Sequence, residues 1–208
     1  MRKTYTVCVA IVMVLVVSLV SQATPVTIAT FQDPSGSAAN PLFVIDSDGL
    51  SIDGGWSDLQ TGLNLDITYA NVVYYDAWFE MSTLTYGGGY SGTTGAGTVE
   101  FHADGDASTV TPVLQIDFTS ANLTPGGISA SELFFVGVTI TIEGADISEE
   151  LTNEAFGFTF ANQELTTLEN NGFTATAAFT SSAEVIPEPA TLCLLGFGAL
   201  ALFRKRRA

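Results

Sequence analysis

Carboxylates grouped on short polar stretches are the side chains of this sequence best suited to binding a cation. Two groups stand out, the second beside a histidine: Asp46, Asp48 and Asp53, then Asp104 and Asp106 next to His102. Ca²⁺ takes about six to eight oxygen ligands, often from Asp on a loop that contains Gly. Neither group has EF-hand spacing, and Asp-Gly and Asp-Ser pairs also form ordinary turns. The sequence therefore allows either a structural Ca²⁺ site, with the first group ahead of the second, or two acidic turns.

His102 is the sole histidine, and residues 24–184 contain no cysteine. A zinc site there would need an unusual set of carboxylates as its remaining ligands. A serine-type triad would need a nucleophile that no motif marks. We therefore expect a strand-edge or turn histidine, no catalytic residue, and no cofactor apart from the Ca²⁺ considered above.

Aromatic residues crowd one third of the middle of the chain, and Trp78, Tyr86 and Tyr90 are the candidates for contacting a ligand. Aromatic faces present a large contact area that can stack on sugar rings. The alternative is that Trp78 and some of the tyrosines lie in the core, because half of an alternating strand must face inward. Both interpretations remain open at this point.

The charges of the chain are separated by sign. All six basic residues lie at the two ends, whereas residues 24–184, here called the body, hold 21 of the 22 acidic residues and no Lys or Arg. A buried carboxylate in the body must therefore be met by backbone N–H groups, hydroxyls, His102 or a cation. Without a basic patch the body has no means of binding nucleic acid through its phosphates.

Alternation of apolar and polar residues predicts that the body is all-β. Clear period-two runs occupy residues 63–69, 114–118, 134–142, 156–160 and 173–179, and weaker ones occupy 42–46, 72–81 and 98–103. Turns are predicted at residues 53–55, 125–127 and 170–172, and one helical turn within 148–155. About eight strands with frequent turns are typical of an antiparallel β-sandwich, of jelly-roll or immunoglobulin-like arrangement.

The N-terminal segment, residues 1–23, is typical of a signal peptide. Arg2 and Lys3 precede an apolar centre over residues 7–20, and Ser21 and Ala23 are the small residues that signal peptidase requires. We predict cleavage after Ala23. The alternative, a retained membrane anchor helix, would need a longer apolar run.

The C-terminal segment, residues 185–208, has three parts in a fixed order. Pro187, Glu188 and Pro189 form an extended, accessible tripeptide because proline disfavours helix before it. The uncharged run 190–203 predicts a helix of about 21 Å, short of the roughly 30 Å hydrocarbon core. A basic tail follows and is expected on the cytoplasmic side by the positive-inside rule. Its residues are Arg204, Lys205, Arg206 and Arg207.

This segment resembles the PEP-CTERM sorting signal of Gram-negative bacteria. The resemblance covers about 22 residues and rests on Pro187-Glu188-Pro189, the apolar run and the basic end. It implies an exported protein of the cell envelope or extracellular space that is held transiently in the inner membrane. It also implies processing by an exosortase, and association with cells that make exopolysaccharide.

Two functions are compatible with these features. The first is a non-enzymatic structural or adhesive role in an exopolysaccharide matrix, with divalent cations or polysaccharide as partners of the acidic body. The second is a carbohydrate-binding module or carbohydrate-active enzyme with a β-sandwich fold. An exposed aromatic platform beside paired carboxylates would favour the second.

Overall fold

The computed structural model describes residues 24–32, 41–48, 50–56, 62–87, 89, 91–103, 111–165 and 172–186. Within it, Pro25–Glu184 forms one compact unit. The predictions for the signal peptide, for residues 187–208 of the C-terminal segment, and for Tyr90, Asp104 and Asp106 lie outside the described residues. The described residues contain no helix of the length and hydrophobicity that crossing a membrane requires.

The described part of the unit is built from β-strands. In chain order they are β1 (Pro25–Phe31), β2 (Phe43–Asp46), β3 (Ser51–Trp56), β4 (Leu63–Ile67), β5 (Val72–Thr85), β6 (Gly92–Thr93), β7 (Gly97–His102), β8 (Leu114–Phe118), β9 (Asn122–Thr124), β10 (Gly127–Ser131), β11 (Ile140–Glu143), β12 (Leu151–Leu165) and β13 (Phe173–Val185). Neighbouring strands pair antiparallel, as β7 does with β8 and β10 with β12.

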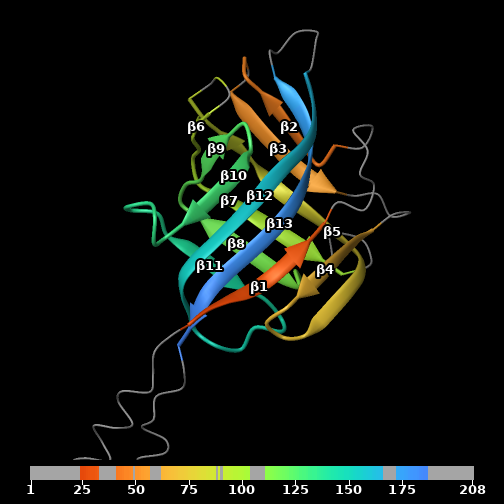
Figure 1. Cartoon of the computed structure of the whole chain (residues 1–208), viewed down its shortest axis with the longest axis vertical. Helices are drawn as coiled ribbons and strands as arrows, with labels where there is room; N and C mark the ends of the chain where they lie inside the picture. The colour runs from red at the N-terminus through yellow and green to blue at the C-terminus, as the bar shows by residue number, and fades with distance from the viewer. Residues whose placement is uncertain are drawn as a thin grey trace, which may run out of the picture. The chain divides into compact units, whose positions relative to one another are not determined.

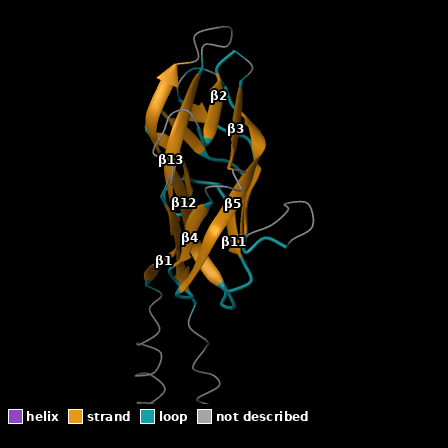
Figure 2. Ribbon diagram, turned by 90° about the vertical axis from the view of Figure 1, so that its right-hand side faces the viewer, coloured by secondary structure: helices purple, strands orange, loops and turns teal. Residues whose placement is uncertain are grey.

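The thirteen strands join into one hydrogen-bonded sheet in the order β11-β8-β7-β5-β3-β2-β13-β12-β10-β9-β6. Strand β1 links β13 to β4, and β4 pairs with β5, so part of the sheet closes into a ring. The sheet folds into two layers, with β12, β13 and β1 in one and β5, β7, β8 and β11 in the other (Figures 1 and 2). The all-β antiparallel class is confirmed, while the pairings establish neither the jelly-roll nor the immunoglobulin-like arrangement.

The long strand β5 contains a bulge and pairs with different strands along its two halves. Its first half pairs with β4 as far as Ala77, and from Trp78 onward it pairs with β7. Just before Ala77, at the shift in the register with β4, Asp76 adopts a φ of 57°, a left-handed conformation that Asp tolerates better than most residues. Such a bulge bends the strand and increases its local twist.

The two layers enclose a single core that is rich in phenylalanine. Phe158 of β12 lies with its ring centroid 4.9 Å from that of Phe43 and 5.0 Å from that of Phe179. Phe79 on the opposite layer lies 5.7 Å from Phe158. These rings come from strands of both layers, so their burial holds the layers together.

Most of the predicted strands are confirmed. The runs beginning at residues 63, 114, 156 and 173 correspond to β4, β8, β12 and β13, and the weaker runs correspond to β2, β5 and β7. The turn at Pro125-Gly126 lies between β9 and β10 as expected. Strands β1, β3, β6, β9 and β10 were not predicted, because they are short or lack a regular alternation.

The predicted strand over residues 134–142 is wrong in its first half. Only Ile140–Glu143 forms a strand, whereas residues 132–137 form turns that leave Phe134 80% and Val136 106% exposed. The reason is the length of the partner: β11 pairs with β8, which ends at Phe118 opposite Ile140. The alternating residues before Ile140 therefore have no strand to pair with.

Two further local predictions are also wrong. Asp53-Gly54-Gly55 was expected to be a turn but lies inside β3. A Cβ placed on Gly54 would lie 2.6 Å from Cε1 of Phe43, its partner on β2, so glycine makes room for that ring within the sheet. The helical turn expected within residues 148–155 is absent, because β12 begins at Leu151.

Candidate functional site

The outward side of β3, β5, β7, β8 and β11, here called the outer face, carries polar and charged side chains. On β7, Val99 and Phe101 are buried in the core, so the alternating Thr98, Glu100 and His102 point the other way. The register places Glu80 of β5 opposite Glu100 and Trp78 opposite His102. Residues 20 to 24 positions apart in the chain thus come together on one side of the sheet.

Several carboxylates of the body are met by neutral donors, as its composition predicts. On the outer face, Asp117 accepts hydrogen bonds from Thr98 Oγ1 at 2.6 Å and from Gln115 Nε2 at 2.7 Å. Asp53 accepts one from Thr83 Oγ1 at 2.5 Å. Hydroxyl and amide groups therefore replace the missing lysines and arginines at these positions.

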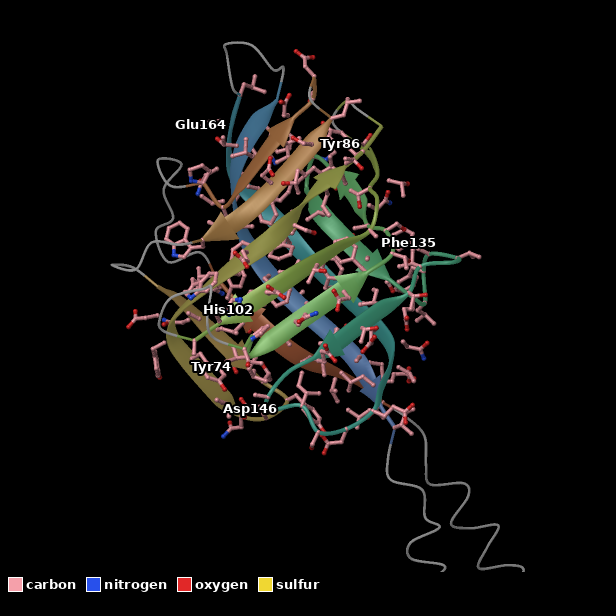
Figure 3. All side chains as sticks on the ribbon, turned by 180° about the vertical axis from the view of Figure 1, so that it is seen from behind. Tyr74, Tyr86, His102, Phe135, Asp146 and Glu164 are labelled. Carbon is pink, nitrogen blue, oxygen red and sulfur yellow. The ribbon has the colours of Figure 1, made fainter. Side chains whose placement is uncertain are left out.

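Tyr74 is the neutral hydrogen-bond donor to Asp146, and the two residues lie close together in Figure 3. The Tyr74 hydroxyl donates to Asp146 Oδ2 at 2.5 Å. This bond, followed by burial of the ring and the nearby negative charge, raises the pKa of Tyr74 to about 12. The tyrosine therefore remains a neutral donor throughout the physiological range.

Glu80 and Glu100 are arranged differently. Together with His102 they bring three potential ligand atoms within 4.8 Å of one another, the one such group of three among the described residues. His102 Nε2 lies 3.8 Å from Glu100 Oε2, and in the part of the chain that the structure describes Glu80 accepts no side-chain hydrogen bond. Two carboxylates and an imidazole are a ligand set suited to a divalent cation.

Trp78 fixes the orientation of the imidazole. Its ring stacks on that of His102 with centroids 4.1 Å apart and an interplanar angle of 3°. The two side chains are only 4% and 2% exposed. His102 (Figure 3), the last residue of β7, is therefore a buried side chain whose ring is held by Trp78.

The first acidic group predicted from the sequence is placed near a turn. Asp46 Oδ1 accepts a hydrogen bond from the backbone N–H of Asp48 at 3.0 Å, in the turn between β2 and β3. Asp53 lies on β3 and bonds to Thr83, as described above. Among the described residues these three carboxylates do not form a group of the kind seen at His102. A Ca²⁺ site at this group stays a prediction.

The structure removes two of the predicted ligand-binding aromatics from the surface. Trp78 and Tyr86 are 4% and 6% exposed, so neither offers a face on which a sugar could stack. The Tyr86 hydroxyl lies 3.0 Å from the backbone carbonyl of Gly89 and 3.3 Å from Ser47 Oγ. Tyr86 therefore ties two loops together.

A second pair of carboxylates lies where β11 meets β12. Glu132 accepts hydrogen bonds from the backbone N–H groups of Ile140 at 2.9 Å and Glu154 at 3.2 Å. Glu154, 5% exposed, accepts one from the N–H of Ile142 at 3.0 Å. Burial, opposed by the bond from Ile142 and reinforced by the charge of Glu132, raises the pKa of Glu154 to about 7.

We expect this carboxyl group to make stability depend on pH. A raised pKa means that the folded protein keeps the proton after the unfolded chain, with a value near 4.5, has lost it. The contribution is fully present below pH 4.5 and is lost as the pH rises through about 7. We expect the loss to be about 1–2 kcal/mol after allowing for solvent screening.

The measurement is urea unfolding of the wild type and Glu154→Gln at several pH values from 4.5 to 8. The neutral amide should lack this component, so its free energy of unfolding should fall less over that range. Glu150→Gln, at an exposed position, is the matched control and should follow the wild type. Identical profiles for Glu154→Gln and the wild type would contradict the assignment.

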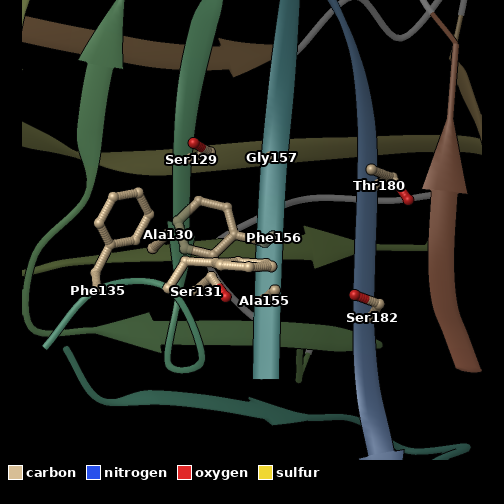
Figure 4. Close-up of a pocket in the computed structure, with 10 residues that line it drawn as sticks. Ser129, Ala130, Ser131, Phe135, Ala155, Phe156, Gly157, Thr180 and Ser182 are labelled. Carbon is tan, nitrogen blue, oxygen red and sulfur yellow. The ribbon is translucent and has the colours of Figure 1, made fainter. Parts of the chain in front are cut away.

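A pocket of about 380 Å³ lies over the other layer, between β10, β12, β13 and the turns after β10 (Figure 4). Its lining combines small and aromatic side chains with four hydroxyls: Ser129, Ala130, Ser131, Phe134, Phe135, Ala155, Phe156, Gly157, Thr180 and Ser182. None of these residues is a charged acid, base or metal ligand. The lining of this pocket therefore contains no side chain of the kind that usually acts as a general acid or base.

The sequence missed Glu80 and Glu100 as site residues, although it singled out His102. The alternation of Glu100 and His102 on one strand was the available local signal. Glu80 is brought in by the register of β5 with β7, which no local pattern specifies.

The comparisons with known proteins concern the C-terminal segment. Residues 185–207 match the model of the PEP-CTERM protein-sorting motif. Neither a curated protein nor a solved structure matches the chain. The resemblance seen at Pro187-Glu188-Pro189 and the basic end is thereby confirmed. The chain carries a PEP-CTERM protein-sorting motif, which marks it as an exported protein that is processed at the membrane by an exosortase.

Proposed function

We propose that the body is a non-enzymatic structural or adhesive component of the cell surface or extracellular matrix. In this proposal its acidic surface associates with exopolysaccharide through bridging divalent cations. The observation that carries it is the charge of the body, which has 21 acidic residues and no Lys or Arg. Such a surface attracts cations and repels other polyanions unless cations lie between them.

The outer face is the part of this surface that we propose makes the contact. It presents carboxylates from successive strands, from Asp53 on β3 through Glu80 and Glu100 to Glu143 on β11. An array of this kind spans several strands, so one polysaccharide chain with its cations could contact several carboxylates at once. The aromatic alternative is weakened because Trp78 and Tyr86 are buried.

Co-sedimentation of the purified exported protein with exopolysaccharide from its native host tests the proposal. We expect binding in the presence of Ca²⁺ and release by a chelator. Asp53→Asn with Glu143→Gln, which removes two charges from the outer face, should weaken binding. Glu149→Gln with Glu150→Gln removes two exposed charges elsewhere and serves as the control.

Calorimetric titrations that are flat for both Ca²⁺ and polysaccharide would overturn the proposal. If the two double variants weaken polysaccharide binding equally, binding depends on the overall charge of the body and not on the outer face. Hydrolysis of the polysaccharide by the purified protein would support the enzymatic alternative.

A further inference from the structure

We propose that Glu80, Glu100 and His102 bind one divalent transition-metal ion, for which Zn²⁺ is the appropriate probe. Their ligand atoms already lie within 4.8 Å of one another. Adjacent ligands in a tetrahedral zinc site lie about 3.3 Å apart, given bonds of about 2.0–2.1 Å. Glu80 is exposed and Glu100 is 33% exposed, so small side-chain rotations of the carboxylates can close this difference. This inference does not rest on the proposed matrix function.

The charge of the site calls for a positive partner. Glu80 and Glu100 are directly opposite on neighbouring antiparallel strands, where like charges destabilise a sheet. Asp117, Asp53 and Asp146 are each met by neutral hydroxyl or amide donors, as described above. The body contains no Lys or Arg that could neutralise the pair, whereas a bound cation would do so.

The histidine is held in the position of a ligand. Its ring is 2% exposed and is clamped flat against Trp78, which prevents free rotation. Nε2 is directed toward Glu100 Oε2 at 3.8 Å, beyond the range of a hydrogen bond but suited to two atoms that close on a common ion. The buried indole N–H of Trp78 has no acceptor among the described residues, and a water on the metal ion would offer one.

The ligand types select the class of ion. Imidazole nitrogen suits zinc, copper, iron and nickel, whereas Ca²⁺ and Mg²⁺ prefer oxygen alone. Three protein ligands leave a coordination position for water, as in zinc sites that are not closed. A bound ion would link β5 to β7 in a body that has no cysteine with which to form a disulfide.

Calorimetric titration of the chelator-treated exported protein with Zn²⁺ at pH 7 tests the site. We expect one ion per chain and a higher Tm in its presence. Both His102→Ala and Glu100→Gln should weaken binding at least about tenfold. Glu150→Gln also removes one negative charge, at an exposed position outside the outer face, and should leave Zn²⁺ binding unchanged.

Two additional readouts separate a coordinated metal ion from general attraction to an acidic surface. The fluorescence of Trp78 should change when Zn²⁺ binds. The chain has one other tryptophan, Trp56, so Trp78→Phe should remove the Zn²⁺-dependent change and leave the signal of Trp56. The affinity for Ca²⁺ should be the same in His102→Ala as in the wild type.

Absence of Zn²⁺ binding to the wild type would overturn the proposal. Equal weakening of Zn²⁺ binding by Glu150→Gln and Glu100→Gln would also overturn it. Glu100→Gln preserves side-chain volume, so it remains informative if His102→Ala fails to fold. The titration contains no polysaccharide, so its failure is distinguishable from failure of the matrix function.

Discussion

Phe158→Ala is expected to lower the free energy of unfolding by about 3–5 kcal/mol. The ring is 2% exposed and packs against Phe179 of the neighbouring strand β13, Phe43 of β2 and Phe79 of the opposite layer. Its removal leaves a cavity at the place where both layers meet. Because single domains are stable by only about 5–15 kcal/mol, this is a large fraction of the total.

Urea unfolding of the purified body measures this loss. Phe134→Ala is the control, since that ring is 80% exposed and its removal should change stability by no more than about 0.5 kcal/mol. Phe158→Leu gives a milder loss that remains measurable if the alanine variant does not fold. A cost for Phe158→Ala below about 1 kcal/mol would contradict the described packing.

Glu188→Ala with Pro189→Ala is expected to leave export intact and to block processing of the C-terminal segment. These substitutions disrupt the extended, negatively charged tripeptide at the centre of the sorting motif. The unprocessed protein should accumulate in the membrane fraction with residues 190–208 still attached. Mass spectrometry of the protein from the native host, in membrane and extracellular fractions, gives both ends of each form.

Glu184→Ala is the matched control, because it removes a carboxylate just outside residues 185–207. We expect it to be processed as the wild type is. Normal processing of the double variant would show that the tripeptide is not required. Retention of residues 190–208 in the mature wild-type protein would contradict the sorting function itself.

The features that the sequence predicted well are those that depend on neighbours along the chain. Alternation over Leu63–Ile67 and Leu114–Phe118 placed β4 and β8, because a strand shows its two faces through every second residue. The sorting motif was equally readable, since its order of parts is linear. Composition alone required the carboxylates to find neutral partners, as Asp117 and Asp146 do.

The features that the sequence did not predict depend on which strands pair with each other and on where each pairing ends. Residues 134–138 alternate as well as any strand, yet β8 ends at Phe118 and offers them no partner. Trp78 was a plausible surface aromatic until its register with His102 placed it in a buried stack.

The sequence by itself determined an exported, acidic, all-β protein with a C-terminal sorting motif. Only the tertiary structure decided that Glu80, Glu100 and His102 form one group. Glu100 and His102 are neighbours on a single strand, but Glu80 reaches them through the bend of β5 and its pairing with β7. A shift of one residue in that register would turn Glu80 to the opposite face of the sheet, and the group would not exist.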